Sequence, residues 1–193
     1  MRILISVIIL LNFLAVSAQH LSFMGIPLGQ DEKIFIQSIK EKGFRLHIKG
    51  TAAGDVYRGD FWKFMDCSLC FFNGYNFTNG SHYTESVHII ASKQNVPEVS
   101  PALYGQLVNT LDSKYGKHHN ATEYMSGYRD GYLWIRPEGF IVSELYSGLE
   151  GLTITISYYD DGCHNAKEAR ENLKKKEKKP VRTMKPRDYN SDL

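Results

Sequence analysis

The chain has 193 residues and a formal net charge of +2, and it contains only three cysteines. That length is enough to enclose one real hydrophobic core, and so few cysteines exclude a fold that depends on a disulfide framework. The charge is uneven: residues 167–193 hold ten Lys or Arg against five Asp or Glu, whereas residues 19–166 hold twelve against sixteen. An acidic body therefore carries a basic tail.

The N-terminal segment has the order of a secretory signal. Arg2 precedes an almost continuous apolar run over 3–16, which the small residues Ser17 and Ala18 follow. The run is shorter than the about 20 apolar residues of a membrane-spanning helix, and its order matches a cleavable signal peptide. We therefore predict a signal peptide over 1–18, no transmembrane segment in the mature chain, and an exported protein that is periplasmic or secreted.

Hydrophobic spacing in the first half of the mature chain predicts one helix followed by three strands. Phe35, Ile36 and Ile39 recur at helical spacing within 30–42, and Gly43 is typical of the helix end. The strands that follow are expected within 44–49, 56–72 and 85–92.

The second half repeats this order. Ser100 and Pro101 are typical of a helix start, and an apolar stripe continues from there to Gly116. Tight turns then separate three runs, so we expect an antiparallel meander. Its strands are expected over 132–136, 140–146 and 152–159.

We therefore predict an α+β fold made of two helix-plus-three-strand antiparallel units, at about 25–95 and 100–160. The units would form a single domain over 19–164, with the helices packed on one face of the sheet and the other face free. Residues 165–193 are expected to form a basic polar tail that is partly helical and then disordered.

The passage Phe23-Met-Gly-Ile-Pro-Leu28, followed by a helix with Phe35 and Ile39, resembles small, functionally uncharacterised exported proteins of Bacteroides-type bacteria. The two predicted units are similar in layout to the tandem αβ repeats of β-lactamase inhibitor proteins. The resemblance to the Bacteroides-type proteins implies an exported protein and carries no catalytic motif. The similarity to β-lactamase inhibitor proteins concerns layout alone and transfers no inhibitory residue to this chain.

Cys67 and Cys70 have the spacing of a thiol redox motif, in which a helix N-terminus lowers the pKa of the first thiol. Their aromatic-rich surroundings predict a strand instead, where residues three apart point to opposite faces and lie about 10 Å apart. A disulfide requires Cα atoms closer than about 7 Å. We therefore favour inert, packed cysteines, and a disulfide between Cys163 and either of them stays open.

Two further groups contain metal-ligand residue types. The passage Asp160-Asp-Gly-Cys-His164 mixes hard and soft ligands, and His118-His119 adds two imidazoles. Carboxylates suit calcium whereas thiolate and imidazole suit zinc, so the mixture matches no single metal well. We interpret the passage as a turn before a helix N-cap and expect no metal and no cofactor.

Aromatic side chains of the second half are the best candidate binding residues. We predict an exposed aromatic face that stacks on a glycan or packs against a protein partner. Its candidate members are Tyr132, Trp134, Tyr146 and Tyr159.

The chain contains no nucleophile elbow, phosphate-binding loop, dinucleotide fingerprint or zinc-protease motif, so no catalytic residue can be named. We expect a non-enzymatic binding or inhibitor-like module whose ligand is a protein or a glycan. The export signal argues against nucleic acid as a partner of the basic tail. Two alternatives stay open: a periplasmic thiol-disulfide protein that uses Cys67 and Cys70, and a structural envelope-associated protein.

Overall fold

A computed structural model describes residues 20–52, 54–78, 80–125, 130–148, 151–161, 171–172 and 174–175. In this part of the chain, eight strands form one antiparallel sheet in the order β3-β4-β5-β6-β10-β9-β8-β7, and β1 and β2 form a separate two-stranded ribbon. In chain order the elements are β1 (Ser22–Phe23), β2 (Ile26–Pro27), α2 (Glu32–Glu41), β3 (Arg45–Thr51), β4 (Gly54–Phe61), β5 (Phe64–Asn76), β6 (Ser81–Ser92), α3 (Pro101–Tyr115), β7 (His119–Asn120), the 3-10 helix η1 (Ala121–Glu123), β8 (Gly131–Arg136), β9 (Gly139–Gly148) and β10 (Gly151–Asp160).

Both helices begin at side-chain caps. Asp31 accepts a hydrogen bond from the Lys33 amide before α2, and Ser100 accepts one from the Leu103 amide before α3, where Pro101 occupies the first turn. These caps satisfy amide groups that have no partner within the helix. Gly116 follows α3 with a φ of +87°, a backbone conformation that residues other than glycine rarely adopt.

The predicted fold class was wrong. The chain is mostly β, and it forms one continuous eight-stranded sheet, not two helix-plus-three-strand units. The segment predicted as one strand over 56–72 is a hairpin of β4 and β5, whose turn passes through Trp62 at a φ of +55°. That turn has no Gly, Pro or Asn at its tip, so the usual turn signal is missing.

Strand β10 joins the two halves into one sheet. It pairs with β9 on one side and with β6 on the other, and Ile156 lies opposite both Ser143 and Ile89. The pairing of β10 with β6 is therefore a long-range contact between segments about 65 residues apart, which local periodicity does not encode.

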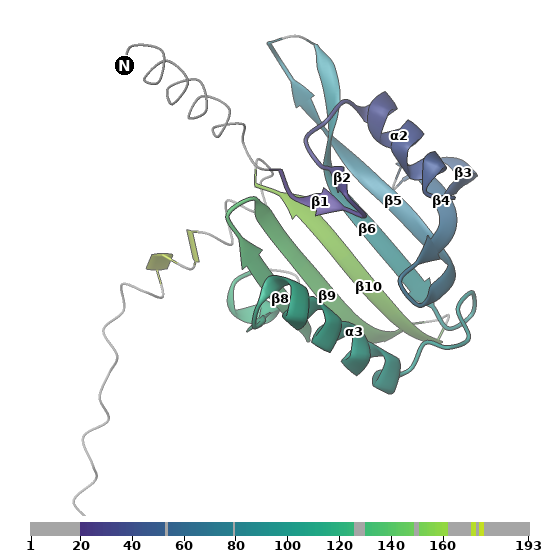
Figure 1. Cartoon of the computed structure of the whole chain (residues 1–193), viewed down its shortest axis with the longest axis vertical. Helices are drawn as coiled ribbons and strands as arrows, with labels where there is room; N and C mark the ends of the chain where they lie inside the picture. The colour runs from purple at the N-terminus through teal and green to yellow at the C-terminus, as the bar shows by residue number, and fades with distance from the viewer. Residues whose placement is uncertain are drawn as a thin grey trace, which may run out of the picture.

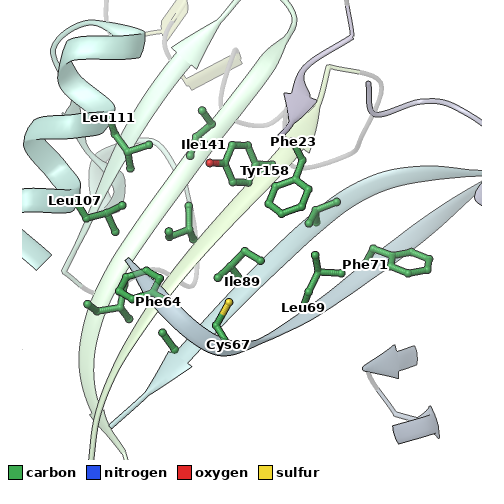
Figure 2. Close-up of a cluster of buried hydrophobic side chains, with 14 of the residues drawn as sticks. Phe23, Phe64, Cys67, Leu69, Phe71, Ile89, Leu107, Leu111, Ile141 and Tyr158 are labelled. Carbon is green, nitrogen blue, oxygen red and sulfur yellow. The ribbon is translucent and has the colours of Figure 1, made fainter. Parts of the chain in front are cut away.

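One face of the sheet carries the main core. Figure 1 shows α2 and α3 over the same face. Figure 2 shows side chains of β5, β6, β9 and β10 from that face gathered against α3, with Leu107 and Leu111 on the helix side. Full burial of each such apolar side chain contributes about 1.5–3 kcal/mol. The labelled residues of this cluster are Phe23, Phe64, Cys67, Leu69, Phe71, Ile89, Leu107, Leu111, Ile141 and Tyr158.

The opposite face was expected to be free, and it is partly buried instead. Ala121 and Met125 belong to a second apolar cluster with Leu133, Phe140 and Val142 of this face. Small polar side chains of the same face are also buried, namely Ser86, Ser92, Thr153 and Ser157. The sheet therefore has an apolar helix face and a mixed opposite face.

The predicted signal peptide lies outside the described residues, as does most of the basic tail. Within the described part of the tail, residues 171, 172, 174 and 175 have helical backbone. The side-chain amide of Asn172 donates a hydrogen bond to the Tyr124 backbone carbonyl at 2.8 Å. Among the described helices, none combines the length and the apolar composition that a membrane-spanning helix needs.

Candidate functional site

The four predicted aromatic residues do not form one exposed face. Tyr132 and Trp134 of β8 lie on the helix face, since they pair in register with Ser143 and Ile141 of β9. Trp134 is only 1% exposed. Tyr159 is 7% exposed on the opposite face, where it stacks on Phe140, and Tyr146, which is 47% exposed, also points to that face. Tyr132 lines the pocket described next.

This first pocket, the α3 pocket, has a volume of about 490 Å³. It lies between α3 and the start of β8. Its lining residues are Tyr104, His118, Asn120, Asp130, Gly131, Tyr132 and Leu145. The Tyr132 ring lies 4.2 Å from the His118 ring and 5.9 Å from the Tyr104 ring, measured between centroids. The Tyr104 hydroxyl donates to the Ser143 carbonyl at 2.8 Å.

Asp112 on α3 orients the imidazole of this pocket. Its carboxylate lies 2.9 Å from His118 Nδ1 and accepts a 2.9 Å hydrogen bond from the Trp134 indole N–H. Burial alone would raise the pKa of Asp112, but the hydrogen bonds from His118 and Trp134 and the charge of His118 lower it below its ordinary value. The pair resembles the base and its orienting acid in hydrolases. The described lining contains no Ser, Thr or Cys nucleophile, so the pair supports hydrogen bonding to a ligand better than covalent catalysis.

Figure 1 shows β5 and β6 as a long hairpin. A second cleft lies beside the tip of this hairpin, and we call it the hairpin cleft. Its volume is about 510 Å³. It is lined by His20, Gly29, Tyr75, Asn76, Phe77, Thr78, Tyr83 and Asp160. The residues come from the N-terminal segment, the hairpin and the end of β10, so only the tertiary structure brings them together.

Aromatic side chains dominate the outer part of this cleft. The Phe77 ring is 90% exposed and meets the Tyr75 ring edge-on at 4.9 Å, and Tyr75 is itself 46% exposed. The Tyr75 ring also contacts the His82 ring, at 5.2 Å between centroids. Contiguous exposed aromatic rings make this cleft a candidate interaction surface.

Buried contacts hold the inner part of the cleft in place. Asp160 is 4% exposed; one of its carboxylate oxygens lies 2.9 Å from His20 Nδ1, and the other accepts the Leu21 amide at 3.2 Å. A Cβ atom at Gly29, whose φ is +77°, would clash with the His20 ring, and one at Gly74 would clash with the Tyr83 ring. Two glycines therefore make room for the imidazole and the phenol.

Another imidazole, that of His88, lies on the opposite face of the sheet. Its Nδ1 is 2.8 Å from Ser157 Oγ and its Nε2 is 3.1 Å from Ser86 Oγ, and the Phe72 and Tyr159 rings contact it edge-on. Burial lowers the pKa of His88 to about 4, because no charge compensates for its loss of water. We interpret it as a structural, neutral histidine.

The two cysteines of the motif do not form a redox pair in the structure. Both are free, buried thiols on β5; Cys67 lies in the helix-face core and Cys70 pairs in register with His88 on the opposite face. Burial raises the pKa of Cys67 to about 12 and also raises the pKa of Cys70. The Cys67 thiol donates to the Gly59 carbonyl at 3.2 Å. Cys163 and His164 lie outside the described residues.

Sequence reasoning missed the aromatic residues of the hairpin cleft. Residues 73–83 read as a polar loop, whereas β5 continues to Asn76 and β6 begins at Ser81. A signal that could have found them is the Asn79-Gly80 pair, which is typical of a hairpin turn. Extension of both strands towards that turn would have placed Tyr75 and Tyr83 on neighbouring paired strands, as they are in the structure, where Asn76 lies opposite Ser81.

Comparison with known proteins adds no relative: no family model, no curated protein and no solved structure matches the chain. The resemblance to exported Bacteroides-type proteins therefore stays a prediction.

Proposed function

We propose that the chain is an extracytoplasmic, non-enzymatic binding module that takes a neutral glycan in the hairpin cleft. The observation that carries this proposal is the Phe77 ring, 90% exposed beside Tyr75 along a cleft of about 510 Å³. A ring so exposed gains free energy when a ligand covers it, at about 25 cal/mol per Å² of apolar surface. The faces of sugar rings, with their C–H groups, suit such flat apolar surfaces.

The polar groups of the cleft favour a ligand without charge. His20, Asn76 and Thr78 supply an imidazole, an amide and a hydroxyl. The carboxylate of Asp160 is buried, and His20 and Leu21 occupy its two oxygens. No Lys or Arg is among the described residues that line this cleft. Neutral donors and acceptors beside aromatic rings are typical of sites for hydroxyl-rich ligands.

Extracytoplasmic location rests on the predicted signal peptide over 1–18. In that compartment glycans of the envelope and surroundings are available, whereas nucleic acid is not an expected partner. The thiol-disulfide alternative has less support, since the two thiols lie on opposite faces and burial raises both pKa values. The envelope alternative rests on the basic tail, most of which lies outside the described residues.

The proposal is tested by titrating the exported protein with a panel of neutral oligosaccharides built from glucose, xylose, mannose and N-acetylglucosamine, using calorimetry. We expect saturable binding by at least one of them and a loss of affinity of about tenfold or more, equal to about 1.4 kcal/mol, in Phe77→Ala. The Phe77 ring is too exposed to support the core, so the melting temperature of this variant should not change.

Tyr146→Ala is the matched control, because it removes a half-exposed aromatic ring of the opposite face that does not line the cleft. Unchanged affinity in this control supports the cleft as the site. Absence of binding across the whole panel, or equal losses in both variants, overturns the proposal.

A further inference from the structure

A third cleft lies at the β3 edge of the sheet, away from the hairpin cleft, and its charge differs from that of the rest of the body. Its volume is about 440 Å³. Its charged and titratable lining consists of Lys42, Arg45, His47, Arg58, Asp60 and Asp66. We call it the β3–β4 cleft. Basic residues thus gather here within a body that is acidic in total.

Two arginines face each other across the strands of this cleft. Arg45 of β3 and Arg58 of β4 are direct partners in register, so their side chains project from the same face about 5 Å apart at Cβ. Like charges at such a position destabilise a strand pair, and natural sheets usually place opposite charges there. An anion bound between the two guanidinium groups would reverse the sign of this interaction.

The two carboxylates of the cleft already have partners within it. Arg58 Nη1 lies 3.2 Å from Asp66 Oδ2, and the Asp66 amide donates to Asp60 Oδ1 at 2.9 Å. Among the described residues, Arg45 has no carboxylate within ion-pairing distance, nor has Lys42 at the end of α2. The cleft therefore keeps an unneutralised cationic side formed by Lys42 and Arg45.

The backbone around the cleft is irregular. The pairing of β3 with β4 shifts register on both sides of Ile48, and the pairing of β4 with β5 shifts between Gly59 and Phe61. Asp66 has a φ of +54°, which costs a residue other than glycine on the order of 1 kcal/mol or more. Bulges and strained residues of this kind concentrate beside functional sites.

We propose that the β3–β4 cleft binds a tetrahedral oxyanion, that is, a phosphate or sulfate group, free or as an ester. The planar forks of Arg45 and Arg58 suit two oxygens each, and the Lys42 ammonium supplies a point charge beside them. Asp60 and Asp66 and the carbonyl end of α2 oppose the anion, so a modest affinity is expected. The site is separate from the hairpin cleft, and it stands whether or not a glycan binds there.

The test measures binding of inorganic sulfate, inorganic phosphate and glucose 6-phosphate to the exported protein by calorimetry, with ionic strength held constant by chloride. Saturable binding of one of these anions is expected, with a loss of affinity of about tenfold or more in Arg45→Gln. Tighter binding of the free ions assigns the site to free oxyanions, whereas tighter binding of glucose 6-phosphate assigns it to esters.

Lys49→Gln is the matched control, since Lys49 lies on the same exposed strand but outside the cleft, and its replacement removes the same charge. Affinity in this control should stay within about twofold of the unsubstituted chain. Absence of saturable binding overturns the inference, and so do equal losses in Arg45→Gln and Lys49→Gln, because that result shows general electrostatic attraction. The Arg45 side chain is exposed, and unchanged circular dichroism of the variant excludes misfolding as the cause.

Discussion

The two faces of the sheet hold a histidine in opposite ways. On the helix face, His118 lies beside the Asp112 carboxylate at 2.9 Å and borders the α3 pocket. On the opposite face, His88 lies between the hydroxyls of Ser157 and Ser86. Aromatic rings contact both imidazoles edge-on, Trp134 in one case and Phe72 in the other.

The difference lies in the partner and not in the rings. A carboxylate offers charge, so Asp112 and His118 stabilise each other electrostatically and the pKa of Asp112 falls below its ordinary value. Serine hydroxyls offer hydrogen bonds without charge, so burial decides and holds His88 neutral. The first arrangement suits a pocket wall, and the second suits the interior of a sheet.

The largest expected effect is an acid-induced loss of stability from His88. When the chain unfolds, His88 regains its ordinary pKa of 6.5, whereas the folded pKa is about 4. The unfolded state therefore takes up a proton first as the pH falls from 6.5 towards 4. Over that window the free energy of unfolding should decrease by up to about 3 kcal/mol, and above pH 6.5 this loss is absent.

Urea unfolding at a series of pH values checks this expectation. The decrease between pH 6.5 and 4 should become smaller in His88→Gln, because that variant has no proton to take up at this position. His118→Gln is the control and should keep most of the decrease. An identical pH profile in His88→Gln and the unsubstituted chain would contradict our account of the opposite face.

A smaller effect is expected from Trp134→Phe on the helix face. The substitution removes the indole N–H that Asp112 accepts and part of a buried ring, so the free energy of unfolding should fall by about 1–2 kcal/mol at pH 7. The pKa of Asp112 should rise. In the unsubstituted chain the lowered pKa of Asp112 stabilises the fold at pH values above its ordinary pKa of 3.8, and this stabilisation is lost as the pH falls through the pKa of the folded state. The stabilisation from Asp112 should therefore be smaller in Trp134→Phe.

NMR titration of the Asp112 carboxyl, together with urea unfolding, measures both changes. Trp62→Phe provides the control, because Trp62 packs against the same main core as Trp134 but no hydrogen bond links it to Asp112. An unchanged pKa of Asp112 in Trp134→Phe would show that the indole does not contribute to the pair.

The smallest expected effect is a difference in alkylation rate between the two thiols of β5. Cys67 lies on the helix face of this strand, and Cys70 lies on the opposite face. Neither Cys67 nor Cys70 should react quickly with iodoacetamide in the folded protein at pH 8, because burial raises both pKa values. Cys70 should react before Cys67, which lies fully buried in the main core. Peptide mapping after timed alkylation, with and without guanidinium, gives the two rates. Recovery of a Cys67–Cys70 disulfide would contradict this expectation.

Much of the local structure was predictable. Both helices begin where Asp31 and Ser100 cap them, and the strands of the β8–β10 meander lie within two residues of their expected positions, because tight turns separate them. The β4–β5 hairpin was not predictable, since Trp62 adopts a positive φ without a turn residue. Of the predicted binding residues, Tyr132 lines the α3 pocket, whereas Trp134 and Tyr159 are buried.

The sequence by itself determined the periods of the helices and strands, the caps and most turns, because neighbours in the chain supply those hydrogen bonds and contacts. It also determined that Cys67 and Cys70 would point to opposite faces, which follows from the alternation of a strand. The tertiary structure alone decided that β10 pairs with β6 and that Trp134 and Tyr159 are buried on different faces. It also brought Asp160 to His20, 140 residues away. Such contacts depend on which elements pack together, and no local pattern contains that information.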